Sequence, residues 1–240
     1  MTKATAAVVR SEIAAARKRW GWTPSDLISL LRGGGNSSKG SEYERELCKR
    51  LSLWWTHGAR DDVFWRSSGS GARAKVRGRG GVDTAGQHGD VAATDPIGAP
   101  FVEAFTTEIK RGYSNHTVQD IIDRPATAGV QAWDDFFAQT IESHEQAGSY
   151  AWLLITRRDR REALVWFPQY VKLDFRRYGI WAVGRPAPYI EMRATIRNGG
   201  GTSTLNIVCV TLDQWLSKVT PETITALMTF RRSAKGQNSV

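Results

Sequence analysis

Seventeen residues separate Asp90 from the segment Glu108-Ile109-Lys110, and this spacing limits how the chain can fold around them. Between them lies Asp95-Pro96-Ile97-Gly98, a combination of residues that is typical of a turn. We therefore expect an antiparallel hairpin over 90–111. With its turn centred near Ala99, this hairpin places Asp90 opposite Glu108.

The two residues that flank Ile109 belong to one face of the expected strand. Successive side chains of a strand alternate, so Glu108 and Lys110 project to the same side. Two neighbouring carboxylates repel each other unless a hard cation lies between them, and oxygen ligands favour Mg²⁺ or Mn²⁺. Asp90, Glu108 and the carbonyl of Ile109 are the candidate ligands. A lysine beside such an ion favours chemistry on a phosphodiester.

Charge and composition favour a globular protein with a polyanionic partner. The 240 residues carry a formal net charge of +9 and suffice for one large domain with an appendage. This charge favours nucleic acid first and an acidic membrane surface second. No apolar run is long enough to span a membrane, and no secretory signal precedes residue 20. Cys48 and Cys209 are too few for a zinc site or disulfide framework, so we expect a cytoplasmic location.

The order of predicted elements indicates an α/β fold with a mixed central sheet flanked by helices. The predicted helices are 8–20, 24–32, 42–56, 117–123 and 130–146, with two more after Thr211 and Pro221. The predicted strands are 63–65, 89–94, 101–111, 150–156, 163–167, 189–196 and 202–210.

Glycine-rich stretches set the predicted domain boundaries. The helix that begins at Pro24 is expected to stop at Gly33-Gly34-Gly35, so 33–40 is predicted to be a linker. Residues 1–35 would then be a helical extension and 36–230 the main domain. Within the main domain, 67–88 is predicted to be a long Arg/Gly loop. Residues 231–240 are predicted to be a frayed tail.

Glu44 is the one charged residue on the apolar side of the predicted helix 42–56. A buried carboxylate is costly unless it is paired or binds a metal, so Glu44 is a further candidate for the metal site. The alternative is a capping box, in which Ser41 is the N-cap and Glu44 the third helical residue. The sequence leaves both interpretations open.

The Arg/Gly loop is the candidate surface for contact with nucleic acid. It begins with Arg66-Ser67-Ser68-Gly69-Ser70-Gly71, where small residues allow the backbone to approach phosphate. Positive side chains then alternate with other residues and supply phosphate-binding donors. These side chains are Arg73, Lys75, Arg77 and Arg79.

Four blocks of the sequence, in order, resemble those of archaeal-type Holliday-junction resolvases. These enzymes belong to the PD-(D/E)xK, or restriction-endonuclease-like, nuclease superfamily. The blocks are Lys39-Gly40 followed by Glu44-Arg45-Glu46-Leu47, then Arg66-Ser67-Ser68-Gly69-Ser70, then Gly89-Asp90-Val91-Ala92-Ala93, then Glu108-Ile109-Lys110. The resemblance covers roughly residues 38–167.

The resemblance implies a restriction-endonuclease-like core and an Mg²⁺-dependent deoxyribonuclease that also accepts Mn²⁺. Glu44, Asp90 and Glu108 would be the acidic metal-site residues, and Lys110 the catalytic lysine. Arg45 and Arg66 would contact phosphate. The substrate would be branched DNA, cut by a homodimer.

The sequence also departs from these resolvases. Gly89 stands in place of the motif's proline, a change that many superfamily members tolerate. The loop after Ser70 is much longer, and the regions before 36 and after 170 have no counterpart. Two alternatives therefore stay open. One keeps the catalytic core in a restriction-type or defence nuclease, or in an exonuclease. The other is a non-catalytic nucleic-acid-binding protein.

Overall fold

The computed structural model describes residues 24–67, 88–113, 115–125, 127–177, 179, 189–198 and 201–237. The chain divides into two compact units, Met1–Ser41 and Glu42–Val240. Helix α2 (Pro24–Trp55) begins at Pro24 as predicted but continues through 33–40, so the predicted linker there is wrong. Each glycine weakens a helix by only about 1 kcal/mol and does not forbid one. The helix predicted over 8–20 lies outside the described residues.

A mixed sheet forms the centre of the second unit and confirms the predicted sheet type. Its strands are β3 (Phe105–Gly112), β4 (Ala151–Arg158), β5 (Leu164–Pro168), β6 (Ile190–Asn198) and β7 (Gly201–Thr211), in the spatial order β3-β4-β5-β7-β6. Strands β3 and β4 are parallel, and the other neighbours are antiparallel. A separate antiparallel pair consists of β1 (Phe64–Arg66) and β2 (Val91–Ala93).

The hairpin predicted over 90–111 is not formed. After β2 the chain enters the short 3-10 helix η1 (Pro96–Gly98) and helix α4 (Ala99–Ala104), and β3 begins only at Phe105. The side chain of Asp95 caps η1 by accepting a hydrogen bond of 3.0 Å from the Ile97 amide. Residues Phe101 and Ala104, one helical turn apart, are both fully buried. A capped, buried helical turn therefore replaces the first part of the predicted strand.

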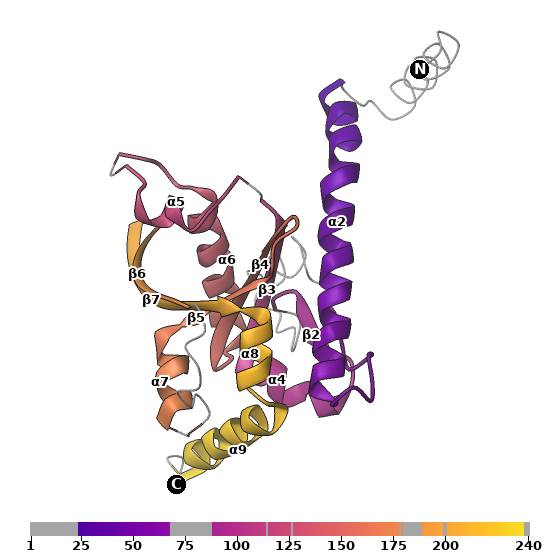
Figure 1. Cartoon of the computed structure of the whole chain (residues 1–240), viewed down its shortest axis with the longest axis vertical. Coiled ribbons are helices and arrows are strands. Elements are labelled where there is room, and N and C mark those ends of the chain that lie inside the picture. The colour runs from indigo at the N-terminus through magenta and orange to yellow at the C-terminus, as the bar shows by residue number, and fades with distance from the viewer. Residues whose placement is uncertain are drawn as a thin grey trace, which may run out of the picture. The chain divides into compact units, whose positions relative to one another are not determined.

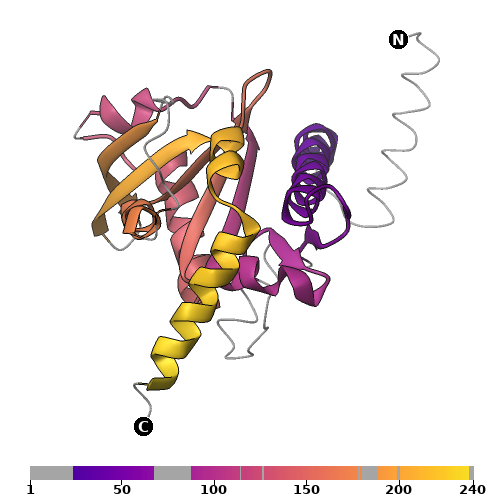
Figure 2. The same cartoon turned by 60° about the horizontal axis from the view of Figure 1, so that its bottom comes forward.

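Two hydrophobic clusters cover the two faces of the five-stranded sheet, as alternation along a strand requires. Leu153 belongs to one cluster and Leu154 to the other. The Leu154 face packs against α6 (Ala132–Ala147) and α5 (Gln119–Ile122). Figures 1 and 2 show α6 on the sheet face opposite α8 (Leu212–Lys218).

The other face is covered by several helices, not all of which were predicted. They are α4, α8, α9 (Pro221–Gln237), α7 (Gln169–Arg177) and the end of α2. Helix α7 was not predicted. Helix α9 extends beyond Arg231 to Gln237, into the segment that was predicted to be a frayed tail. Among the described residues, no helix has both the length and the apolarity needed to cross a bilayer.

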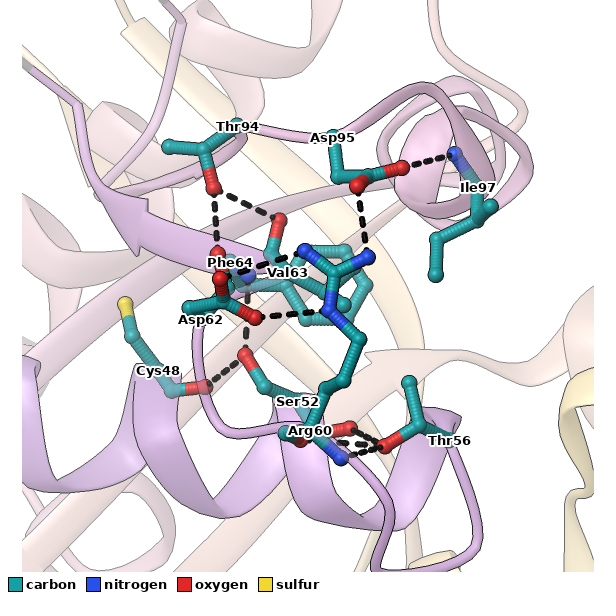
Figure 3. A network of polar contacts seen from close by, with 10 residues as sticks. All are labelled: Cys48, Ser52, Thr56, Arg60, Asp62, Val63, Phe64, Thr94, Asp95 and Ile97. Atoms are coloured by element: carbon teal, nitrogen blue, oxygen red, sulfur yellow. Dashed lines mark hydrogen bonds and ion pairs between the residues drawn. The ribbon is translucent and has the colours of Figure 1, made fainter.

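A polar network fixes the β1–β2 pair to the end of α2 (Figure 3). Ser52 Oγ donates to the Cys48 carbonyl and accepts from the Phe64 amide, both at 2.8 Å. The Arg60 guanidinium donates to Asp62 at 2.9 Å and to Asp95 at 2.7 Å. Together these bonds hold the strand that follows Asp90 in a defined position.

Candidate active site

Asp90 lies against the edge of β3 that faces away from β4. Its backbone amide donates to the Thr107 carbonyl at 2.7 Å, and its carboxylate Oδ2 accepts from the Ile109 amide at 2.8 Å. In a parallel pair, alternate residues direct both N–H and C=O away from the partner strand. Thr107 and Ile109 face outward in this way, and Asp90 satisfies groups that would otherwise lack a partner. The Ile109 carbonyl leaves the strand on the same edge.

Gly89 allows this close approach. Its φ is +76°, and an added Cβ would lie 2.7 Å from the Thr107 carbonyl oxygen. Proline requires a φ near −65°, so it cannot occupy this position without moving the backbone. The departure from the superfamily's proline therefore follows from how the backbone meets β3.

Glu108 and Lys110 lie together on the α6 face of β3, which confirms that they project to the same side. Lys110 Nζ is 3.5 Å from Glu108 Oε2. Helix α6 adds two residues that the sequence analysis missed: Ser143 Oγ donates to Glu108 Oε1 at 2.8 Å, and Gln139 Nε2 donates to Glu108 Oε2 at 3.0 Å. Gln139 Oε1 also accepts from Lys110 Nζ at 3.0 Å. Gln139 therefore bridges the carboxylate and the ammonium group.

The electrostatics of the site fit a bound cation. Asp90 and Glu108 are only 7% and 3% exposed. Burial first, and then the charge of Glu108, raise the pKa of the Asp90 carboxyl well above its ordinary value, although Lys110 and the Ile109 amide oppose this. A divalent ion would remove the repulsion between the two carboxylates. The donors are all oxygen atoms, the set that Mg²⁺ and Mn²⁺ prefer.

Glu44 lies near these acids but has a partner of its own. It forms an ion pair with Arg66, and the Glu44 side chain is 15% exposed. Its charge still contributes to the raised pKa of Asp90. The capping-box interpretation is wrong, since α2 runs through Ser41 instead of beginning there. Within the residues that the structure describes, no three His, Cys, Asp or Glu side chains gather as a metal-binding group.

The candidate DNA-binding residues divide into two sets. Arg66 forms an ion pair with Glu44, which lies near the two acids. Arg45 is exposed on α2. The others lie outside the described residues: Ser68, Arg73, Lys75, Arg77 and Arg79.

A family model matches residues 35–226, and the family is described as phage putative PDDEXK endonuclease. The chain belongs to this family. The PDDEXK match agrees with the predicted nuclease class and with a restriction-endonuclease-like fold, here a mixed five-stranded sheet between helices. The match does not support the narrower resemblance to Holliday-junction resolvases. Searches of curated proteins and of solved structures gave no match.

Proposed function

We propose that the chain is an Mg²⁺-dependent DNA endonuclease whose site consists of Asp90, Glu108, Lys110 and the Ile109 carbonyl. The observation that carries this proposal is the placement of the buried Asp90 carboxylate on the Ile109 amide, between two residues of the Glu-x-Lys segment. Membership of an endonuclease family supports the same reaction class. The net charge of +9 supports a polyanionic substrate.

Each residue has a distinct task in the proposed mechanism. Asp90, Glu108 and the Ile109 carbonyl would hold Mg²⁺, which supplies positive charge to the phosphate oxygens when bound. Ser143 and Gln139 orient the Glu108 carboxylate. Such supporting hydrogen bonds fix how a ligand faces the ion.

Lys110 orients the attacking water and stabilises the negative charge that develops during the reaction. Its ammonium group is held by Gln139 Oε1 and Glu108 Oε2, so its position is set before DNA binds. It donates hydrogen bonds to the attacking oxygen and to the phosphate. Hydrolysis then leaves a 5′ phosphate on one product and a 3′ hydroxyl on the other. Glu44 adds a third negative charge beside the site, and Arg66 holds it in place.

Branched DNA is the substrate that the four resolvase-like blocks favour. Cutting opposing strands of a four-way junction needs two sites, so this part of the proposal includes a twofold-symmetric homodimer. The long Arg/Gly loop and the strands after residue 188 instead favour recognition of linear duplex by a restriction-type nuclease.

One assay separates these possibilities. Wild-type protein is incubated in Mg²⁺ with a synthetic four-way junction, a flap and a linear duplex of matched sequence. Preferential, paired nicking of the junction supports a resolvase, and sedimentation should then give a dimer. Equal or better cutting of duplex supports a restriction-type nuclease, and release of single nucleotides from ends supports an exonuclease. DNA binding without cleavage in Mg²⁺ or Mn²⁺ would leave a non-catalytic binding protein.

A further inference from the structure

A cavity of about 430 Å³ opens beside Lys110 and is not explained by the residues assigned above. It lies where β3 and β4 end, so its walls come from the segment after β3, the β4–β5 turn and the first half of α6. Pockets outside the carboxyl ends of parallel strands are common ligand sites in α/β proteins. Its volume is within the range of about 300–1,000 Å³ that is typical of small-ligand pockets.

Aromatic rings form one wall of this pocket. Tyr113 is 47% exposed, and its ring meets that of Phe136 edge-on, with centroids 4.6 Å apart. Behind them Trp133 is buried, and its indole N–H donates to the Thr117 carbonyl at 2.8 Å. Tyr113 is therefore held against Phe136, and nearly half of its surface is accessible. A ring held in this way suits stacking against a planar group.

Arginines at the end of β4 and in the β4–β5 turn form a charged rim of the pocket. Arg157, Arg158, Arg160 and Arg161 all line the pocket. Arg157 forms an ion pair with Glu46 at 3.2 Å, and its guanidinium lies over the Tyr43 ring. For Arg160 and Arg161, which are exposed, the structure gives no ion pair within the part of the chain that it describes. One carboxylate, Glu162, shares the lining, so the rim keeps a net positive charge.

We propose that this pocket binds an unpaired nucleotide of the DNA substrate next to the bond that is cut. The base stacks on Tyr113, and its phosphate lies on the Arg160–Arg161 rim. A paired base must first be unpaired and unstacked to enter a cavity, whereas an unpaired base turns out at lower cost. The inference rests on the proposed nuclease function. It names the substrate class as DNA with an unpaired nucleotide, such as a bulge, a branch point or a single strand.

The direct test compares two labelled DNAs, a fully paired duplex and the same duplex with one unpaired 2-aminopurine. Binding is measured in EDTA, so cutting does not interfere. Wild-type protein should bind the bulged DNA more tightly and change the 2-aminopurine fluorescence. Tyr113→Ala should weaken binding to the bulged DNA by about 5- to 100-fold, the effect of losing one base-stacking contact, and leave paired DNA unaffected.

Matched variants separate stacking from general damage. Tyr113→Phe keeps the ring and should behave as wild type. Tyr189→Ala removes another exposed tyrosine, which lies outside the pocket, and should change neither affinity. Circular dichroism and thermal unfolding check that Tyr113→Ala is folded. Equal wild-type affinity for the two DNAs, or an equal loss on both with Tyr113→Ala, would overturn the proposal.

The arginine rim has its own readout. Arg161→Ala should reduce the salt dependence of binding to the bulged DNA by about one phosphate contact, a slope change of about 0.7–0.9 on logarithmic axes. Arg176→Ala, an exposed arginine on α7, should leave the slope unchanged. If Arg161→Ala does not alter the slope, the rim does not hold the phosphate.

A cleavage assay in Mg²⁺ distinguishes failure of the pocket from failure of the nuclease. Cutting of both DNAs at one rate, unaffected by Tyr113→Ala, would overturn the pocket and leave the nuclease standing. If the protein binds the bulged DNA in a Tyr113-dependent way but cuts neither DNA in Mg²⁺ or Mn²⁺, the nuclease proposal is contradicted and the pocket assignment stands. Cutting beside the bulge that depends on Tyr113 supports both.

Discussion

The Asp90 carboxylate accepts a hydrogen bond of 2.8 Å from the amide of Ile109, although Asp90 lies outside the five-stranded sheet, just before β2. This bond brings an acid from the end of the loop that precedes β2 to the edge of β3. Glu108 and Lys110 flank Ile109 in the sequence and project from the α6 face of the same strand. The edge of β3 therefore gathers two acids and one ammonium group around a single backbone position.

The buried charge of Asp90 should make the metal-free protein less stable. Asp90→Asn keeps an oxygen acceptor for the Ile109 amide but removes the repulsion from Glu108 and the penalty of burying a charge. We expect its melting temperature in EDTA at pH 8 to rise, by roughly 2–4 °C if the gain is about 1 kcal/mol. Asp95→Asn is the control and should lower the melting temperature, since the Ile97 amide and Arg60 stabilise the charged form of Asp95. A lower melting temperature for Asp90→Asn would contradict this prediction.

Magnesium should stabilise the wild-type protein, because an ion that binds only the folded state shifts unfolding to higher temperature. Differential scanning calorimetry with increasing Mg²⁺ measures this effect independently of cleavage. Asp90→Asn and Glu108→Gln should both abolish the increase. The same increase in either variant would place the ion elsewhere.

Gln139 should be required for efficient catalysis although it is not a metal ligand. Gln139→Ala removes the bridge between Glu108 and Lys110, and the loss of such a supporting contact typically costs about 10- to 100-fold in activity or metal affinity. Initial rates of cleavage in Mg²⁺ measure the loss. Gln146→Ala, on an exposed part of the same helix, is the control and should cut as wild type does. If Gln139→Ala cleaved DNA at the wild-type rate, Gln139 would have no role in catalysis.

Two glycines with positive φ should respond differently to alanine. Gly148 has φ +61° and open space around it, so Gly148→Ala should cost about 1 kcal/mol of unfolding free energy. Gly89→Ala adds a methyl group 2.7 Å from the Thr107 oxygen and should cost about 2 kcal/mol more, since overpacking adds to the backbone strain. Urea unfolding gives both values. Equal losses of unfolding free energy in the two variants would show that the close approach to β3 does not require glycine at position 89.

Asp134 should contribute stability that is lost in acid. Burial by itself raises its pKa, but hydrogen bonds from the Arg197 and Gln131 amides and from Arg124 outweigh burial and lower it below 3.8. An acid with a lowered folded-state pKa stabilises the fold above about pH 4, and this contribution disappears as the pH falls through the lowered value.

Asp134→Asn tests this contribution. At pH 7 it should cost about 3 kcal/mol, as expected for breaking a buried ion pair. The difference from wild type should shrink between pH 4 and pH 2 in urea unfolding. Asp135→Asn, on the exposed side of the same helical turn, should change little at any pH. A difference that does not depend on pH would exclude a titrating contribution from Asp134.

The sequence predicted which side chains would lie together better than it predicted the path of the chain between them. Glu108 and Lys110 share a face because side chains alternate along any strand, a local rule that tertiary structure does not alter. The position of Asp90 was predicted from a hairpin that does not form. The apolar segment that begins at Phe101 suits a strand or a helical turn equally, and the cap at Asp95 and the burial of Phe101 decide for the helix.

Gln139 and Ser143 were missed because their importance depends on how α6 docks on the sheet. They are four residues apart and so lie on one helix face, adjacent to the buried Phe136 and Thr140. A polar pair at this spacing beside an apolar stripe was the available signal. Without the parallel pairing of β3 with β4, nothing in the sequence directs that pair toward Glu108.

Cleavage of supercoiled plasmid DNA in Mg²⁺ by wild-type protein, Asp90→Asn and Lys110→Ala decides whether Asp90 and Lys110 belong to a nuclease site. We expect the wild type to produce nicked or linear DNA with 5′ phosphates, and we expect EDTA to stop this cleavage. Both folded variants should lose cleavage, and Asp90→Asn should still bind DNA. Cutting by both variants at the wild-type rate would contradict the assignment of the site.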